Sequence, residues 1–309
     1  MLIGALAQSL PDIDFVFALF LDVTQNLLAH RGITHSLFFL LLITPLFAWI
    51  GYAKWRGKLK WRHWVFFIAL EIAIHLFLDS LNNYGMGLLE PFDDMRIALH
   101  TIFVADPLFS IWPFLGLITL LILARTHRKR MLLASTGIGL AVLYLVFAFI
   151  NKMRIEDRFN NSLQNQGIAY ERKLTTPTPF NNLLWFVTAG GKDGFYVGYR
   201  SVFDSRDSTQ FQFFPRNEEL LREVKDREDV KDLIRFSQGF YTVEKWGDTT
   251  IFNDLRFGQV AGWVDPKAKF VFHYFLDRPD EENILVVQRG RFDGWNRESI
   301  SKLWDKVKE

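Results

Sequence analysis

The sequence predicts a multi-pass α-helical membrane domain followed by a soluble α+β domain built on a mainly antiparallel sheet. The first observation is the uneven distribution of charge. Residues 1–150 contain 11 Lys+Arg and 9 Asp+Glu, whereas residues 151–309 contain 25 of each. The second is the change from long apolar stretches to short alternating runs beyond residue 150. We therefore expect a membrane domain over 1–150, a juxtamembrane helix and linker over 151–180, and an extracytoplasmic domain over 181–309.

Three stretches of the first half carry no formal charge and are long enough, or nearly so, to cross a bilayer. They are Ser36–Ala53, Pro107–Ala124 and Leu132–Ile150. A fourth stretch, His63–Asn82, is equally apolar except for Glu71, His75 and Asp79. Helices that are apolar on every face over this length are typical of membrane spans rather than of soluble cores.

The chain starts with the apolar segment Met1–Leu10, which is too short to span a membrane and is followed by Pro11. Proline removes a backbone donor and restrains the residue before it, so a helix is expected to end here. No basic region precedes the segment, which makes it a poor signal peptide. We expect either a short re-entrant helix or the end of a helix that begins upstream.

Loop charges predict how the membrane domain is oriented. Lys54–Arg62 contains five basic residues and Arg125–Arg130 contains four. The two helices between these loops place both on one side, which the positive-inside rule makes cytoplasmic. The other two loops, Pro11–His35 and Asp79–Asp106, are acidic. We expect them, together with residues 151–309, to lie outside the cytoplasm of a plasma (inner) membrane protein.

The second half reads as a sheet with two helices. Aromatic and β-branched runs separated by Gly, Asp and Pro turn signals predict seven strands. They are Leu184–Ala189, Phe195–Phe203, Gln210–Phe214, Phe240–Trp246, Thr250–Phe257, Lys269–Leu276 and Ile284–Gln288. Asn151–Gln166 is expected to continue the last span, and Thr175–Phe180 to form a rigid turn. Charged segments at Asn217–Phe236 and Arg297–Lys308 are expected to be helical.

Composition excludes several function classes. A net charge of +2 argues against a globally basic nucleic-acid binder. The absence of cysteine excludes a disulfide scaffold, thiol catalysis and Cys-ligated zinc.

Polar residues inside a membrane helix indicate a functional site, because they are costly there. Glu71, His75 and Asp79 lie at i, i+4 and i+8 and so share one helical face. They could be a polar network that fixes helix packing, a proton relay, or part of a metal site.

Further acidic and imidazole groups are expected at the same outer leaflet. Leu10–Asp14 supplies Asp12 and Asp14, His30–Ser36 supplies two histidines, and Asp106 opens the next helix. Imidazole with carboxylate suits Zn²⁺, Mn²⁺ or Fe. Each pair alone is common by chance, and Asp106 before Pro107 is most simply an N-cap. Taken together, these groups predict a metal site at the membrane face.

These motifs resemble those of the YdjM-type family of predicted inner-membrane metal-dependent hydrolases. The resemblance rests, in order along residues 1 to about 125, on five blocks. They are Leu10–Asp14, His30–Ser36 (His-Arg-Gly-Ile-Thr-His-Ser, the most specific), His75–Gly85, Glu90–Phe92 and Asp106–Phe109. Pro179–Asn181 and Tyr196–Tyr199 also resemble the soluble extension of longer members. Members usually carry a Thr-His pair in a helix upstream of the Pro-Asp motif, and this chain begins inside that region.

The resemblance implies a bacterial membrane-bound hydrolase that uses metal-activated water. The implied ligands are Asp12, Asp14, His30, His35, His75 and Asp79, which exceed the usual number for one catalytic zinc and make two ions plausible. Zinc is the first expectation, with Mn, Fe or Mg as alternatives.

Three further residues receive expected roles. Glu71 would orient the free ring nitrogen of His75. Arg31 would clamp an anionic substrate oxygen, unless it is only a snorkelling interfacial arginine. Asp106 would be a further ligand or a general base, with the N-cap as the simpler interpretation.

A site at the outer bilayer face favours an amphiphilic or lipid-linked substrate, for example a phosphoester. Two other classes of function remain open at this point. An ion- or proton-coupled transporter could use Glu71, His75 and Asp79 as its path. A non-enzymatic scaffold could bind a partner through its aromatic-rich outer sheet, although aromatic residues in strands are more often core.

Overall fold

The computed structural model describes residues 2–55, 59–206, 208–277 and 297–308, and the chain divides into two compact units. Unit 1 contains Met1–Leu99 together with Leu221–Gly239, a segment from the second half of the sequence. Unit 2 contains His100–Leu220, Phe240–Tyr274 and the C-terminal helix. Unit 1 therefore combines the first part of the chain with a segment from its second half.

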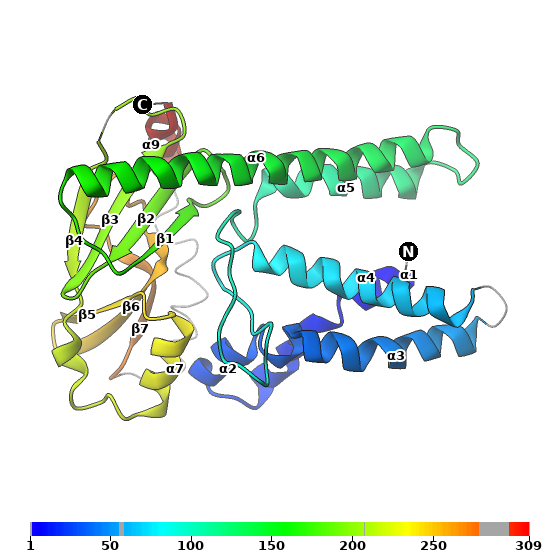
Figure 1. Cartoon of the computed structure of the whole chain (residues 1–309), viewed down its shortest axis with the longest axis horizontal. Coiled ribbons are helices and arrows are strands. Elements are labelled where there is room, and N and C mark those ends of the chain that lie inside the picture. The colour runs from blue at the N-terminus through cyan, green and yellow to red at the C-terminus, as the bar shows by residue number, and fades with distance from the viewer. Residues whose placement is uncertain (1, 56–58, 207, 278–296, 309) are drawn as a thin grey trace. The chain divides into compact units, whose positions relative to one another are not determined.

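Unit 1 is helical. Its elements are α1 (Leu2–Gln8), the 3₁₀ helix η1 (Pro11–Leu19), α2 (Val23–Ala29), the 3₁₀ helix η2 (Ile33–His35), α3 (Leu37–Lys54), α4 (Trp61–Ser80) and α7 (Glu228–Phe236). The long helices α3 and α4 lie side by side (Figure 1). Gly51 makes this approach possible, because a Cβ there would lie 2.6 Å from the Trp64 ring. Ser36 caps α3 by accepting a hydrogen bond from the Phe39 amide at 3.0 Å.

Unit 2 begins with a second helix pair, α5 (Pro107–Ile122) and α6 (Arg130–Asn165), which also pack side by side (Figure 1). Gly137 lets them approach closely, because a Cβ there would lie 2.5 Å from the Trp112 carbonyl oxygen. At about 1.5 Å per residue the 36-residue α6 is longer than the hydrocarbon core of a bilayer. The C-terminal part of α6 buries Ile155 and Phe159 against the sheet residues Trp185 and Val187, as expected for a span that continues into the soluble domain.

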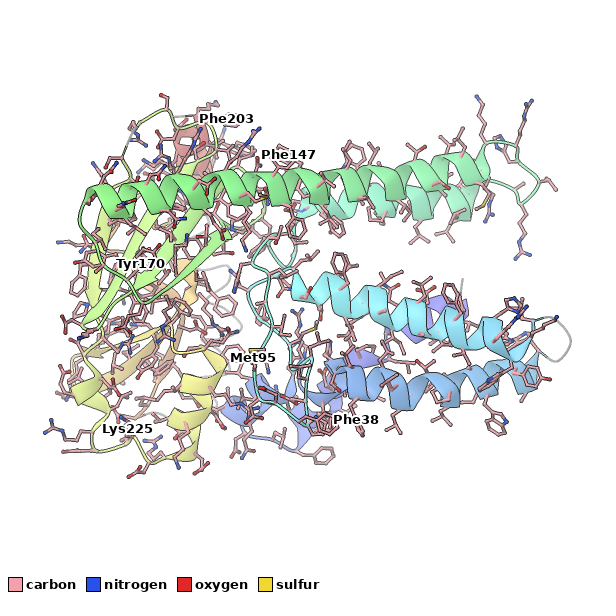
Figure 2. All side chains as sticks on the ribbon, viewed as in Figure 1. Phe38, Met95, Phe147, Tyr170, Phe203 and Lys225 are labelled. Atoms are coloured by element: carbon pink, nitrogen blue, oxygen red, sulfur yellow. The ribbon has the colours of Figure 1, made fainter. Side chains whose placement is uncertain are left out.

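Three of the described helices, α3, α4 and α6, are long and apolar enough to cross a membrane. Their exposed side chains are largely apolar, and Phe38 and Phe147 project from α3 and α6 (Figure 2). The remaining expected span, Pro107–Ala124, forms α5, which is apolar but has only 16 helical residues. The prediction of an α-helical membrane domain followed by an α+β domain is confirmed.

The soluble part of unit 2 contains two antiparallel sheets. The first has the order β1-β2-β3-β4, with strands Arg172–Pro177, Leu184–Gly190, Gly194–Ser201 and Phe211–Pro215. The second has the order β5-β6-β7, with strands Tyr241–Trp246, Thr249–Gln259 and Phe270–Phe275. Helix α9 spans Arg297–Lys308 and buries Leu303 and Val307 beside Leu184 and Trp263. Six predicted strands and the terminal helix are thereby found, and the seventh, Ile284–Gln288, lies outside the described residues.

Two segments differ from expectation. Arg172–Pro177, expected within a linker, pairs with β2 as strand β1, and its threonines are buried. The segment Asn217–Phe236, expected as one helix, forms the short 3₁₀ helix η3 (Glu218–Leu221) and then α7.

Candidate metal centre

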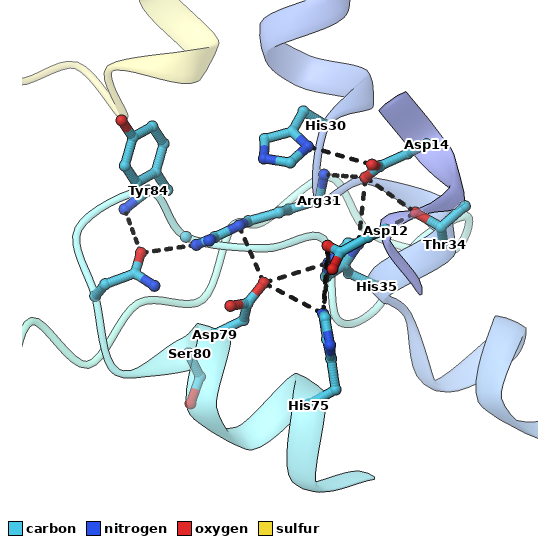
Figure 3. Close-up of polar contacts among 12 residues, drawn as sticks. Asp12, Asp14, His30, Arg31, Thr34, His35, His75, Asp79, Ser80 and Tyr84 are labelled. Atoms are coloured by element: carbon cyan, nitrogen blue, oxygen red, sulfur yellow. Dashed lines mark hydrogen bonds and ion pairs between the residues drawn. The ribbon is translucent and has the colours of Figure 1, made fainter. Parts of the chain in front are cut away.

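Four potential ligand atoms of unit 1 converge on one point (Figure 3). Asp12 lies in the first turn of η1, and His35 is the last residue of η2. His75 and Asp79 lie one turn apart on α4, so that both side chains project from the same helical face. The C-terminal end of α4 and two short helices thus build the cluster.

The distances between these atoms match those expected around one metal ion. His35 Nε2 lies 3.2 Å from His75 Nε2 and 3.3 Å from Asp79 Oδ2. Asp12 Oδ1 lies 3.6 Å from each histidine Nε2, and His75 Nε2 lies 3.6 Å from Asp79 Oδ2. Four ligands at tetrahedral angles and about 2.0–2.2 Å from a zinc ion are roughly 3.3–3.6 Å apart.

The cluster is buried on one side and open on the other. The His35 side chain is fully buried, whereas the Asp12 side chain is 55% exposed. His75 and Asp79 lie between these extremes. Asp12 is therefore the most solvent-exposed of the four side chains.

Asp14 supports the cluster from behind His35. Its buried Oδ2 accepts a hydrogen bond from the Arg31 amide at 2.8 Å and lies 3.4 Å from His35 Nδ1. Its Oδ1 lies 3.2 Å from His30 Nδ1. A carboxylate behind the second nitrogen of a histidine fixes the tautomer and orientation of a metal-binding imidazole.

Arg31 supports the cluster on its other side. Its backbone φ of +60° is uncommon for a residue with a side chain. Its guanidinium lies beside Asp79, with Nε 3.0 Å from Oδ2. Nη1 donates to Asn82 Oδ1 at 2.8 Å, and the guanidinium lies over the Tyr84 ring. The charge of Arg31 offsets part of the negative charge of the two cluster carboxylates.

The carboxylates around His35 favour positive charge at this position. Hydrogen bonding to His35 lowers the pKa of Asp12 below its ordinary value. Burial alone would lower the pKa of His35, but hydrogen bonds to Asp12 and Asp79 outweigh burial and raise it. Burial alone would raise the pKa of Asp14, but its hydrogen bonds to His30 and to the Arg31 amide lower it.

The donor set also fits a divalent metal ion chemically. Asp79 Oδ2 is buried and has no aligned hydrogen-bond donor, although it lies within 3.6 Å of His35, His75 and Arg31. Two imidazole nitrogens face each other across 3.2 Å. A cation at the common point would be coordinated by this carboxylate oxygen and by both imidazole lone pairs. Two imidazoles with two carboxylates suit zinc and related divalent ions.

Four further residues expected at the site lie beside the cluster or have other partners. Asp14 and His30 contact each other beside the four-atom cluster, and Arg31 contacts Asp79 and Asn82. The Glu71 carboxylate lies against α1, 2.9 Å from where a Cβ of Gly4 would stand, and its expected role toward His75 stays a prediction.

Asp106 belongs to unit 2, where it caps α5. Its Oδ1 accepts hydrogen bonds from the Leu108 and Phe109 amides at 2.9 and 3.3 Å. Its Oδ2 accepts one from the Tyr144 hydroxyl at 2.7 Å. The geometry is that of the N-cap, which was the simpler interpretation of the Asp-Pro pair.

Three supporting residues were not singled out from the sequence. Thr34 Oγ1 contacts both Asp14 and His35, at 3.3 and 3.1 Å. Asn82 holds Arg31, and Arg96 donates to the His30 carbonyl at 3.0 Å. Thr34 and Asn82 lie inside the motifs that were recognised, so a signal for them was present. Arg96 lies in a loop without periodicity and carried none.

Comparison with known proteins supports the importance of this region. The family model described as YdjM inner membrane protein matches residues 1–155, which include all four converging ligands. Inner membrane protein YbcI of Escherichia coli (strain K12) is 35% identical over 95 residues, which are 30% of this chain and 54% of YbcI. The match thus spans about half the length of that relative.

A second relative extends beyond the membrane domain. Uncharacterized protein YfhP of Bacillus subtilis (strain 168) is 26% identical over 270 residues, which are 83% of this chain and 77% of YfhP. A match of that length must include much of the chain after residue 155. No solved structure matches this chain.

Proposed function

Because the chain belongs to the YdjM inner membrane protein family, we propose that it is a membrane-bound hydrolase that depends on a divalent metal ion. The observation that carries this proposal is the convergence of Asp12, His35, His75 and Asp79 at distances suited to one ion. A bound divalent ion would lower the pKa of a coordinated water to about 7 and polarise the scissile group. Zinc is the first candidate, with Mn, Fe or Mg as alternatives.

The four ligands are proposed to play unequal parts. His35, His75 and Asp79 form a set of two imidazoles and one carboxylate, a combination that catalytic metal sites use while leaving further positions open. Asp12 stands at the solvent side of the cluster and is half exposed. We propose that Asp12 accepts the proton from the attacking water, in addition to any contact with the ion.

Arg31 acts as a positioning residue in this proposal, rather than as the substrate clamp that the sequence suggested. Its guanidinium is engaged with Asp79 and Asn82 and is buried. A proton path along α4 is less well supported, because it leaves Asp12 and His35 of the four-residue cluster without a role. The hydrolase is therefore favoured over the transporter.

The membrane orientation proposed from the loop charges places the metal centre at the outer leaflet. The loops at residues 54–62 and 125–130 would be cytoplasmic, and residues 151–309 extracytoplasmic. The metal cluster lies at the end of α4 opposite to the basic loop that precedes it.

Apolar side chains around the cluster support an amphiphilic or lipid-linked substrate. In η1 and just after it, Phe15 and Phe20 are 70% and 80% exposed, on the element that supplies Asp12. Phe92 is 82% exposed, and its ring packs edge to face on Phe38 in the first turn of α3. Because α3 is a candidate span, these side chains continue its lipid-facing surface around the cluster. A lipid headgroup could then meet Asp12 while its acyl chains stay in the bilayer.

The proposal is tested with the purified full-length chain in vesicles of phosphatidylethanolamine and phosphatidylglycerol. Mass spectrometry of the lipids before and after incubation detects any headgroup or acyl product. We expect hydrolysis that a chelator stops and that added Zn²⁺ or Mn²⁺ restores. Asp12→Asn should abolish turnover, whereas the variant still binds added Zn²⁺ because His35, His75, Asp79 and the new amide oxygen remain. Hydrolysis that is unaffected by complete metal removal would contradict a metal-dependent hydrolase, and no product from metal-loaded protein would contradict a phospholipid substrate.

A further inference from the structure

A helix from the second half of the chain is part of the unit that contains the metal centre. Helix α7 belongs to the segment Leu221–Gly239, which groups with Met1–Leu99 and not with the sheets around it in sequence. It lies well beyond the end of the family match at residue 155. Its apolar face is buried, since Val230, Leu233 and Phe236 are at most 2% exposed.

Polar contacts hold α7 to two parts of unit 1. Asp232 Oδ2 accepts a hydrogen bond from Thr24 of α2 at 3.3 Å. Arg235 forms an ion pair with Asp94 at 2.7 Å and lies 3.5 Å from Glu90. Both acidic residues belong to the loop between α4 and unit 2, residues 81–99, which we call the clasp loop.

The clasp loop in turn fixes the backbone that carries the cluster. The Gly87 amide donates to the Arg31 carbonyl at 2.8 Å, and the Leu37 amide donates to the Leu88 carbonyl at 3.0 Å. These hydrogen bonds tie the clasp loop to both ends of the segment Arg31–Leu37, which includes His35.

Arg96 joins α7 to that backbone directly. The Arg96 guanidinium is buried and lies over the ring of Phe236, with its central carbon 5.9 Å from the ring centroid. Its nitrogens donate at 3.0 Å to the carbonyl oxygens of Leu28 and His30, and to that of Gly85 in the clasp loop. The Arg96 side chain thus links α7, the clasp loop and His30. The next residue, Arg31, donates its backbone amide to Asp14.

We infer that α7 positions the metal centre through Arg96, so that the C-terminal half of the chain sets how rigidly the His30–His35 segment is held. Phe236 and Arg96 are positioning residues in this account and touch neither metal nor substrate. The inference rests on the proposed function only where it concerns metal affinity, because the rigidity of the segment can be measured without metal.

The test uses Phe236→Leu, which keeps most of the buried apolar volume but removes the ring under Arg96. Hydrogen–deuterium exchange of the metal-free, full-length chain is followed in peptides covering residues 28–37, with a β2 peptide (184–190) as the internal control. Leu233→Met, on the same buried face of α7, is the matched variant that leaves the ring in place. We expect at least 10-fold faster exchange at the Arg31 and Gly32 amides in Phe236→Leu alone, with β2 unchanged.

Metal affinity is measured on the same variants by competition with a chromogenic chelator for Zn²⁺. Changes to groups that orient metal ligands typically weaken binding about 10–100-fold, and we expect Phe236→Leu to fall at the lower end of that range. Combining it with Arg96→Lys should cost less than the sum of the two single losses, because both changes affect the same linkage. If wild type binds no zinc, the proposed function fails, and the exchange experiment still decides the inference. Wild-type exchange at residues 28–37 in folded Phe236→Leu would overturn it.

Discussion

At the scale of single residues, two carboxylates in one motif take different roles because of the local helix type. Asp12 and Asp14 both lie in the 3₁₀ helix η1. At about three residues per turn, positions i and i+2 point in different directions. Asp12 therefore faces the other potential ligands, whereas Asp14 faces His30 and the far side of His35. The sequence predicts that both carboxylates lie at this end of the membrane domain, but it does not separate a direct ligand from a carboxylate that only supports the ligands.

This difference gives the first prediction. His75→Ala removes one of the four converging ligands and should weaken Zn²⁺ binding by more than 100-fold. His30→Ala removes only a partner of Asp14, and Asp14→Asn weakens the acceptor behind His35, so each should cost about 10–100-fold. Competition titration with a chelator ranks the three variants. Equal, large losses for His30→Ala and His75→Ala would indicate that His30 is a ligand after all.

At the scale of elements, the ends of helices can be predicted from the sequence because caps and prolines are local signals. The surface against which α7 packs cannot be predicted in this way. The charged sequence Asn217–Phe236 predicts a helix, and its buried Val230, Leu233 and Phe236 show an apolar face. Nothing in that pattern specifies α2 and the clasp loop as the surface that covers it. Strand β1 was missed for a related reason, because Thr175–Pro177 contains the turn-like Thr-Pro pattern yet pairs with β2.

The role of Asp106 is tested at this scale. Asp106→Ala removes the cap of α5 and leaves the Tyr144 hydroxyl without its acceptor. Loss of a cap costs about 0.5–2 kcal/mol, and an unsatisfied buried hydroxyl about 1–3 kcal/mol. We therefore expect a lower thermal midpoint for Asp106→Ala and a smaller shift for Asp106→Asn, which retains an acceptor oxygen. Metal content should be unchanged in both variants, and loss of metal in folded Asp106→Asn would instead support its role as a ligand.

At the scale of the whole molecule, the charge distribution predicts sidedness as well as fold class. Nine of the eleven basic residues before residue 151 fall in the loops 54–62 and 125–130, while the motif residues lie in the acidic loops and their flanking helix ends. The positive-inside rule turns this asymmetry into an orientation. The order of the helices predicts on which side of the membrane each motif lies. The sequence therefore predicts that Asp12, His35, His75 and Asp79 share one leaflet, but it does not predict the distances between them.

The orientation is measurable because the chain contains no cysteine. Single cysteines are introduced at exposed positions in the basic loop (Lys60→Cys) and in the sheet domain (Lys192→Cys). The outer membrane of bacterial cells that produce each variant is made permeable, and the cells are treated with a maleimide that cannot cross the inner membrane. We expect labelling of Lys192→Cys only, and labelling of both after the inner membrane is opened. Labelling of Lys60→Cys alone in intact cells would reverse the proposed topology and place the cluster on the cytoplasmic side.

The most direct test of the account is the metal content of the full-length protein purified in detergent without chelators. Inductively coupled plasma mass spectrometry should find a stoichiometric divalent transition metal in wild type. The double variant His35→Ala/His75→Ala, which removes both imidazoles of the cluster, should contain almost none while keeping its helical content. Metal-free wild type, or a double variant that retains the metal, would contradict the claim that Asp12, His35, His75 and Asp79 form a metal centre.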